Sequence, residues 1–133
     1  MRIRHHDSLT DLDDAWWEEA GMLGFSSSAS AYRVDPNAFA GREINEVFIH
    51  DIGQVGEQRQ TIGIFRDCID TGRTARERVL YILSGFRSGA ALPPVEIARD
   101  QHGCHPYRLT HGTHRLYCSL AAGFLKIPTV EQI

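Results

Sequence analysis

The chain lacks any apolar run long enough to cross a membrane. Of its 133 residues, 42% are hydrophobic and 23% are charged, which is an ordinary balance for a globular protein. A stretch of about 18 apolar residues, the length that a spanning helix needs, does not occur. The first seven residues are rich in arginine and histidine and do not resemble the apolar core of a secretory signal. We therefore expect a compact globular protein with no membrane partner.

Cysteine is scarce as well. The three cysteines, Cys68, Cys104 and Cys118, are an odd number and contain no C-x-x-C pair. Because small disulfide-stapled domains use several paired cysteines, this count does not suggest a disulfide framework. A reducing cytoplasm is the expected location.

Lysine occurs once, so thirteen of the fourteen basic side chains are arginines. Residues 1–58 carry 4 basic and 11 acidic side chains, a balance of −7, whereas residues 59–99 carry 7 and 4, and residues 100–133 carry 3 and 2. Guanidinium groups bind phosphates in bidentate geometry, so an anion is expected in the basic half. The net charge of −3 is a poor match for strong nonspecific DNA binding, which leaves nucleic acid as the weaker alternative.

Two segments carry strong helical signals. Residues 74–87 open with a capping box at Thr74 and Glu77 and are stopped by Gly89. Their apolar side chains recur at helical spacing and predict one buried face: Val79, Ile82, Leu83 and Phe86. Four arginines are then left mostly to solvent: Arg73, Arg76, Arg78 and Arg87. Residues 113–122 predict a second helix, which ends at Gly123.

The other helical and loop predictions concern the first third of the chain. Residues 8–21 predict a short helix, with Asp11, Asp13 and Asp14 in its first turn, where negative charge suits the dipole. The serine-rich residues 26–30 predict a loop. For residues 57–71 the sequence does not decide between a helix and a strand.

Strand composition appears at four places. Residues 46–52 predict a strand, and residues 95–99 and 107–110 predict a β-hairpin with a turn at 100–103. Residues 127–130 predict a last strand, at the edge of its sheet because Pro128 has no N–H to donate. The order of helix, strand, helix, hairpin, helix and strand predicts an α+β domain, a mixed sheet with packed helices.

The binding site is expected at the turn between the second strand of the hairpin and the last helix. Gly112 lets the backbone approach a ligand closely, and Thr113 is placed to cap the helix. Amides at the positive end of a helix dipole bind anions, and His114 and Arg115 add donors and charge in the first turn. Residues 112–115 therefore predict a phosphate-binding turn.

The last 40 residues closely resemble the ParB/sulfiredoxin superfamily. The resemblance rests on a Pro93-Pro94 pair before a hydrophobic strand, a Y-x-L strand at residues 107–109, the helix start at residues 112–115 and an Ile127-Pro128 strand. Upstream, residues 47–52 and 74–87 correspond to the family's first strand and first long helix, and Gln58-Arg59 resembles its first box without the proline. The resemblance implies a family domain over residues 41–133, preceded by an N-terminal helical extension over residues 1–40.

The resemblance also implies a ligand and its site. The ligand is a nucleoside triphosphate, ATP or CTP, with Mg²⁺ for a catalytic member, and the function is phosphotransfer, nucleotide hydrolysis or a nucleotide-gated switch. The residues that match the family's binding positions are Gly112, Thr113, His114, Arg115, Arg59 and Pro94.

Departures from the family pattern narrow the function. Thr113 stands where sulfiredoxins carry their attacking cysteine, so sulfinic-acid reductase chemistry is not expected. ParB partition proteins bind CTP at the equivalent box and need a following helix-turn-helix domain, which these residues do not include. Centromere loading by this chain alone is therefore not expected.

Several functions stay open beside nucleotide binding. The chain also resembles free serine kinases, whose carboxylate base would correspond to Glu43, Glu46 or Asp51, and nothing in the sequence selects among these three. One alternative is a DNA-associated, nuclease-like or plasmid-maintenance protein of the ParB type. Another is a non-catalytic domain that acts through protein contacts.

Histidine and cysteine side chains gather in the last third of the chain. Five possible ligands fall within a short stretch: His102, Cys104, His105, His111 and His114. Their spacing fits no standard zinc pattern, so no metal site is expected. Cys118 and His114 lie four residues apart and form a possible nucleophile pair, although a small core residue is the favoured role for Cys118.

Overall fold

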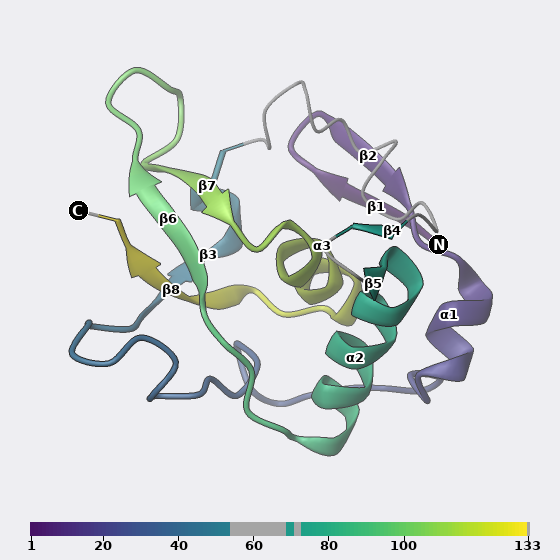
Figure 1. Ribbon diagram of the computed structural model, residues 1–133. Coiled ribbons are helices and arrows are strands. Elements are labelled where there is room, and N and C mark those ends of the chain that lie inside the picture. Colours follow the sequence, from purple (N-terminus) through teal and green to yellow (C-terminus); the bar gives the residue numbers. More distant parts are fainter. Residues whose placement is uncertain (54–68, 71–72, 133) are drawn as a thin grey trace.

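The computed structural model describes residues 1–53, 69–70 and 73–132, and it combines helices with a mixed β-sheet (Figure 1). The predicted α+β class is confirmed. Most of the segment left open at residues 57–71 lies outside the described residues. Its end forms a small ladder of β4 (Ile69–Asp70) with β5 (Arg73–Thr74). No helix of the described part is long and apolar enough to cross a membrane.

The main sheet has four strands in the spatial order β3-β8-β6-β7. Strands β6 (Val95–Arg99) and β7 (Tyr107–His111) form the predicted antiparallel hairpin. Strand β8 (Lys126–Glu131) runs parallel to β6 and antiparallel to β3 (Asn45–Phe48). The chain therefore crosses from β7 to β8 through the helix that connects them.

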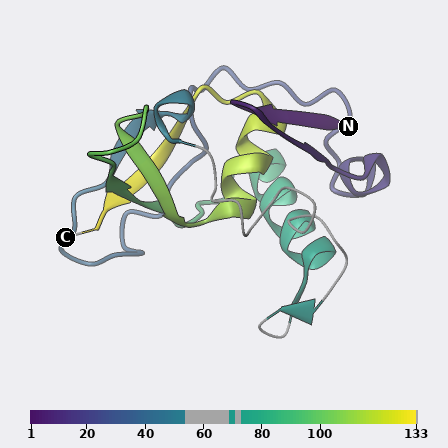
Figure 2. The same ribbon diagram turned by 90° about the horizontal axis from the view of Figure 1, so that it is seen from above.

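The helices form layers on one side of this sheet. Helix α3 (Thr113–Ala122) lies next to the sheet, α2 (Ala75–Ser88) packs on α3, and the short α1 (Asp14–Glu19) packs on α2 (Figure 2). The predicted helices 74–87 and 113–122 are confirmed to within one residue at either end. Glycines with positive φ end both helices, as predicted, at Gly89 (φ 75°) and Gly123 (φ 88°).

Helix α2 follows its sequence signals closely. The Thr74 hydroxyl oxygen accepts a hydrogen bond from the Glu77 amide at 3.1 Å and donates to the Glu77 carboxylate at 3.3 Å. The Glu77 carboxylate thus accepts from the Thr74 hydroxyl, whereas in a capping box it accepts from the Thr74 backbone amide. The four predicted core residues are all buried: Val79, Ile82, Leu83 and Phe86.

Of the arginines predicted to be left mostly to solvent, Arg87 is exposed, whereas Arg76 and Arg78 are half-buried. Two of them also make contacts at α1. Arg76 forms an ion pair with Glu19 at the end of α1. The Arg87 Nε donates to the Gly21 carbonyl at 3.1 Å, just beyond the same helix. These side chains therefore fasten α1 to α2.

The predicted helix over residues 8–21 is wrong in its first half. Strands β1 (Arg2–His5) and β2 (Ser8–Asp11) form a hairpin. Within residues 1–40, the predicted helical extension, the structure has one helix, the six-residue α1. Asp11 belongs to β2, where its carboxylate pairs with Arg2 across the hairpin at 3.1 Å. The hairpin adds Ile3 to the same apolar core that holds Leu83 and Leu116.

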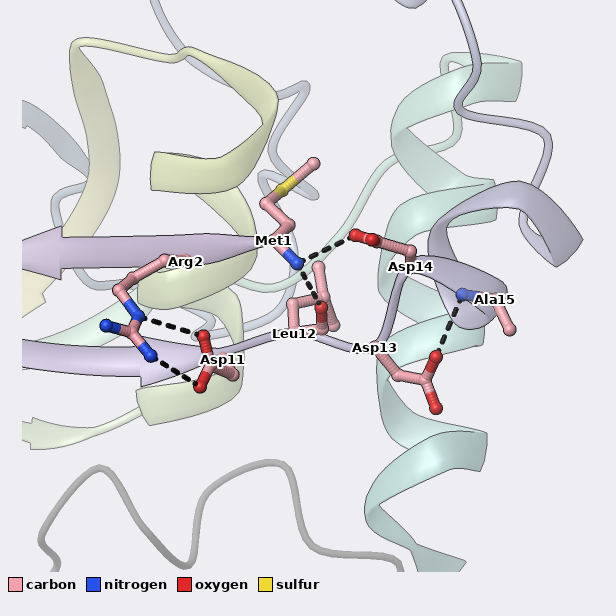
Figure 3. Close-up of polar contacts among 7 residues, drawn as sticks. All are labelled: Met1, Arg2, Asp11, Leu12, Asp13, Asp14 and Ala15. Carbon is pink, nitrogen blue, oxygen red and sulfur yellow. Dashed lines mark hydrogen bonds and ion pairs between the residues drawn. The ribbon is translucent and has the colours of Figure 1, made fainter.

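A small polar cluster joins the hairpin to α1 (Figure 3). The Met1 ammonium donates to the Asp14 carboxylate at 2.7 Å and to the Leu12 carbonyl at 2.9 Å. Asp13 is the N-cap of α1, and its carboxylate accepts from the Ala15 amide at 2.9 Å. The aspartates predicted to lie in the first turn of a helix over residues 8–21 therefore lie where β2 ends and α1 begins.

Two strand predictions also need correction. The predicted strand 46–52 stops at Phe48, and the 3₁₀ turn Ile49–Asp51 follows, which buries Ile49 together with Ile52. Strand β8 is central in its sheet, not at an edge, although Pro128 stands in it opposite Glu46. Burial of Ile127 and Val130 in the core outweighs the one ladder hydrogen bond that the proline cannot make.

Candidate functional site

The candidate site begins at a glycine that no other residue can replace without strain. Gly112 joins β7 to α3 with φ 110° and ψ 32°, a left-handed conformation that side chains disfavour. A Cβ atom at this position would lie 2.6 Å from Cγ1 of Val95 and 3.1 Å from Nη2 of Arg115. The nearest neighbours of Gly112 are therefore a core side chain and the predicted arginine, and its predicted close approach to a ligand stays a prediction.

Thr113 does not cap the helix as predicted. Gly112 is the N-cap, without a side-chain hydrogen bond, and Thr113 is the first helical residue. The Thr113 side chain is buried, and its hydroxyl has no hydrogen-bond partner among the described residues. Because a buried hydroxyl usually has a partner, this oxygen is a donor and acceptor still to be satisfied.

The start of α3 carries uncompensated positive potential. The helical hydrogen bonds begin with the Leu116 amide, which donates to the Gly112 carbonyl at 3.0 Å, so the amides of Thr113 and Arg115 have no intrahelical acceptor. Helices α1 and α2 each place a carboxylate in the first turn, whereas α3 has none. The amides and the helix dipole together favour an anion there.

Arg115 adds a cation to this turn. Its Nη2 donates to the Pro94 carbonyl at 3.4 Å, and its buried Nε has no partner in the described part of the chain. No described carboxylate forms an ion pair with it. The structure thus brings together Pro94 and residues 112–115, with the half-buried guanidinium held by the long hydrogen bond to Pro94 and by its interaction with the Tyr32 hydroxyl.

Tyr32 belongs to this site, although sequence reasoning missed it. Its buried ring stacks on Phe86 at 5.4 Å, and its hydroxyl donates to the Pro93 carbonyl at 2.6 Å. Burial raises the pKa of Tyr32, and the nearby Arg115 opposes that shift. The tyrosine therefore remains a neutral hydrogen-bond donor that positions the Pro93-Pro94 segment beside Arg115.

No sequence signal points to Tyr32. It follows the serine-rich residues 26–30, which form a loop as predicted. Two backbone hydrogen bonds hold its segment to Leu92. The Asp35 amide donates to the Leu92 carbonyl at 2.8 Å, and the Leu92 amide donates to the Arg33 carbonyl at 3.0 Å. These contacts cross about half the chain, which periodicity over a short window does not detect.

Two of the predicted binding residues remain. His114 is the second residue of α3 and is half-buried beside the turn. Arg59 lies outside the described residues, so its predicted role stays a prediction.

The three predicted carboxylate bases lie away from the turn. Glu43 and Glu46 precede or belong to β3, at the opposite edge of the sheet from β7, and Glu46 accepts from the Ser30 hydroxyl at 3.4 Å. Three strand spacings separate these edges by about 14 Å. Asp51 lies beside His50 at 3.4 Å, near the start of β7 and not near its end at Gly112.

A fourth carboxylate, Glu96, lies beside the strand residue that precedes Gly112. Glu96 stands opposite His111 in the β6–β7 ladder, next to Val95. Since Val95 and Ile97 are buried toward the helices, Glu96 projects from the other face of the sheet. It does not compensate the charge at the start of α3.

Metal and cysteine sites gain no support. Among the described residues, no three His, Cys, Asp or Glu side chains are placed to hold a metal ion. Cys118 is fully buried in α3, and burial raises the pKa of its thiol, so it does not suit a nucleophile paired with His114. Cys104 is exposed in the β6–β7 loop.

Comparison with known proteins does not identify the ligand of this site. No protein-family model matches the chain, and no curated protein matches it in sequence. The resemblance to the ParB/sulfiredoxin superfamily therefore stays a prediction.

Proposed function

We propose that the chain is a nucleotide-binding domain that holds the phosphates of a nucleoside triphosphate, ATP or CTP, at residues 112–115. The observation that carries this proposal is the start of α3. There a left-handed glycine, amides without intrahelical acceptors and an arginine without a described carboxylate partner converge on one point.

Each group has a role in this binding. The amides of Thr113 and Arg115 donate to phosphate oxygens, and the left-handed conformation of Gly112 sets the direction in which the chain enters α3. The Arg115 guanidinium supplies charge and directional donors. His114 supplies a further donor, and the Thr113 hydroxyl gains the hydrogen bond that it lacks. The resemblance to the ParB/sulfiredoxin superfamily supports the same residues.

Binding is better supported than turnover. Phosphotransfer or hydrolysis needs a base near the transferred phosphoryl group, and Glu46 and Asp51 lie away from the turn. Mg²⁺ enters this proposal with the nucleotide, coordinated by its phosphates, since the described residues offer no cluster of three metal ligands. A nucleotide-gated switch therefore ranks above an enzyme.

The DNA-associated alternative receives less support. Its electrostatic basis is the arginine content, yet several arginines are committed to contacts within the chain. These are Arg2 with Asp11, Arg76 with Glu19, Arg87 with the Gly21 carbonyl and Arg99 with Glu131. Salt-sensitive DNA binding at low ionic strength that survives Arg115→Ala would favour this alternative over nucleotide binding.

We also place the chain in the cytoplasm. The two described cysteines, Cys104 and Cys118, are both free thiols, which fits a reducing compartment.

A thermal-shift series tests the proposal. Wild type, Arg115→Ala and Arg115→Lys are melted with ATP, CTP, pyrophosphate or phosphate, each with and without Mg²⁺. At 100 times its Kd, a ligand stabilises the native state by about 2.7 kcal/mol, or a Tm shift of about 5–10 °C for this length. The exposed Arg108 on β7 offers the matched control, Arg108→Ala. We expect the shift in wild type and the control, a reduced shift in the lysine variant and none in the alanine variant; no shift with any anion in wild type overturns the proposal.

A further inference from the structure

Three histidine rings from two distant parts of the chain lie against one another outside the proposed phosphate site. His5 ends β1, His6 follows it in the hairpin turn, and His105 belongs to the loop between β6 and β7. The rings of His6 and His105 are stacked, with centroids 3.9 Å apart and an interplanar angle of 27°, whereas the rings of His5 and His6 are tilted by 47° with centroids 4.4 Å apart. This histidine stack is the contact between the tip of the N-terminal hairpin and the β6–β7 loop.

The stack is built for uncharged rings. His5 is 3% exposed, and its buried Nε2 has no hydrogen-bond partner among the described residues. The His6 Nε2 lies 2.9 Å from the Ile52 carbonyl, which only accepts, so this nitrogen carries a proton in both the neutral and the charged ring. Protonation would therefore add charge to the stack without adding a hydrogen bond at this contact.

No described carboxylate is placed to neutralise such charge. Within the described residues, Asp7 of the hairpin turn and Asp51 of the 3₁₀ turn form no ion pair with the stacked rings, and Asp51 instead lies beside His50 at 3.4 Å. From α3, the group that faces the stack is Tyr117, whose ring meets His5 edge-on at 6.1 Å. From the segment after the 3₁₀ turn, it is the backbone of Ile52 and Gly53.

We infer that the histidine stack is a pH-sensitive clasp, which holds the N-terminal hairpin against the β6–β7 loop while the buried ring of His5 is neutral and releases it when that ring is protonated. Imidazole changes its charge between pH 5 and 8 more readily than any other side chain. Two cationic rings at stacking distance repel each other, and a charged ring at the His5 position is removed from water without a counter-ion.

The electrostatics of His5 agree with this geometry. Burial, followed by the neighbouring His6, lowers the pKa of His5 to about 4. The folded hairpin therefore resists protonation of this ring, whereas a released hairpin does not. Mass action then favours release as the pH falls. The inference does not depend on phosphate binding at α3.

Hydrogen exchange at pH 7.5 and pH 5.0 tests the clasp, with protection factors corrected for the intrinsic pH dependence of exchange. Each proton taken up only by the released hairpin lowers protection by up to about tenfold per pH unit. We expect amides of β1 and β2 to exchange through release of the hairpin, with lower protection than amides of β6 and β8, and to lose at least about tenfold of their protection between the two pH values. The variant His5→Phe keeps a ring at the buried position but removes its charge, and the matched control is His102→Phe, at an exposed position of the β6–β7 loop.

The two variants separate the outcomes. The loss of protection in β1 and β2 should shrink by at least about threefold in His5→Phe and persist in His102→Phe. Equal protection of hairpin and sheet amides at both pH values overturns the clasp, because the hairpin would then open only when the whole domain unfolds. An unchanged loss in His5→Phe overturns it as well, since the buried ring would not control the release.

Discussion

The Cβ position of Gly112 lies 2.6 Å from Cγ1 of Val95, so the turn into α3 packs directly on the first residue of β6. Val95 is fully buried and β-branched, and it has little freedom to move aside. The same strand follows Pro94, whose carbonyl accepts from Arg115. One close contact therefore fixes the geometry of the turn relative to the arginine beside it.

Gly112→Ala should destabilise the protein by about 2–4 kcal/mol, because it combines a positive φ with overlap against Val95. Gly123→Ala is the matched control, since its φ is also positive but nothing lies within 4 Å of the added Cβ. It should cost only the backbone term, about 1–2 kcal/mol. Urea unfolding measures both, and equal losses would show that Val95 does not restrict the turn.

Thr113→Val should leave the free protein as stable as wild type or up to about 1–2 kcal/mol more stable, because it removes a buried hydroxyl without a described partner. The same variant should weaken nucleotide binding, since the hydroxyl is proposed to contact phosphate. Thr129→Val is the comparison: its hydroxyl donates to the Asn45 carbonyl at 2.7 Å, so its loss should cost about 1 kcal/mol. Denaturant unfolding of both variants decides, and a clear destabilisation by Thr113→Val would mean that its hydroxyl is already bonded.

Acid should lower the global stability through His5. Its folded pKa of about 4 lies below the ordinary value of about 6.5, so between these values the unfolded chain binds the proton and the folded chain does not. The free energy of unfolding therefore falls as the pH drops from 6.5 to 4, by up to about 1.4 kcal/mol per pH unit and about 3 kcal/mol in all. Urea titrations across this range should show a smaller slope in His5→Phe than in wild type. Identical slopes would contradict the assignment.

The two described cysteines should differ sharply in reactivity. Cys104 is exposed, whereas Cys118 is fully buried and its thiol pKa is raised. Iodoacetamide at pH 8 followed by peptide mapping should label Cys104 in the native protein and Cys118 only after unfolding. Rapid native labelling of Cys118 would restore the nucleophile pair with His114.

Sequence patterns predicted the elements in which several local signals agree. Helix α2 has a capping threonine, an apolar face at helical spacing and a terminal glycine, and each lies where predicted. The turn at Gly112 was predicted for the same reason, because a glycine between a strand and a helix restricts what the backbone does there. Thr113 alone was misassigned, since the glycine itself takes the capping position.

The errors occur where a tertiary contact outweighs a local signal. The β1–β2 hairpin turns at His6, whose φ of 55° is a conformation that glycine or asparagine usually signals. Pro128 indicates an edge strand, but core burial of its neighbours places it at the centre of the sheet. Tyr32 lies near Arg115 because its ring packs on Phe86 and its segment pairs with Leu92. The residues around Tyr32 in the sequence carry no pattern that predicts these long-range contacts.

The most direct test of phosphate binding at α3 is amide NMR of the full chain during titration with ATP, CTP and pyrophosphate. The account predicts that the largest shifts occur at the backbone amides of residues 112–115, that they saturate, and that they vanish in Arg115→Ala but not in Arg108→Ala. Saturable shifts centred elsewhere, or none at millimolar ligand, would contradict the assignment of this turn as the phosphate site.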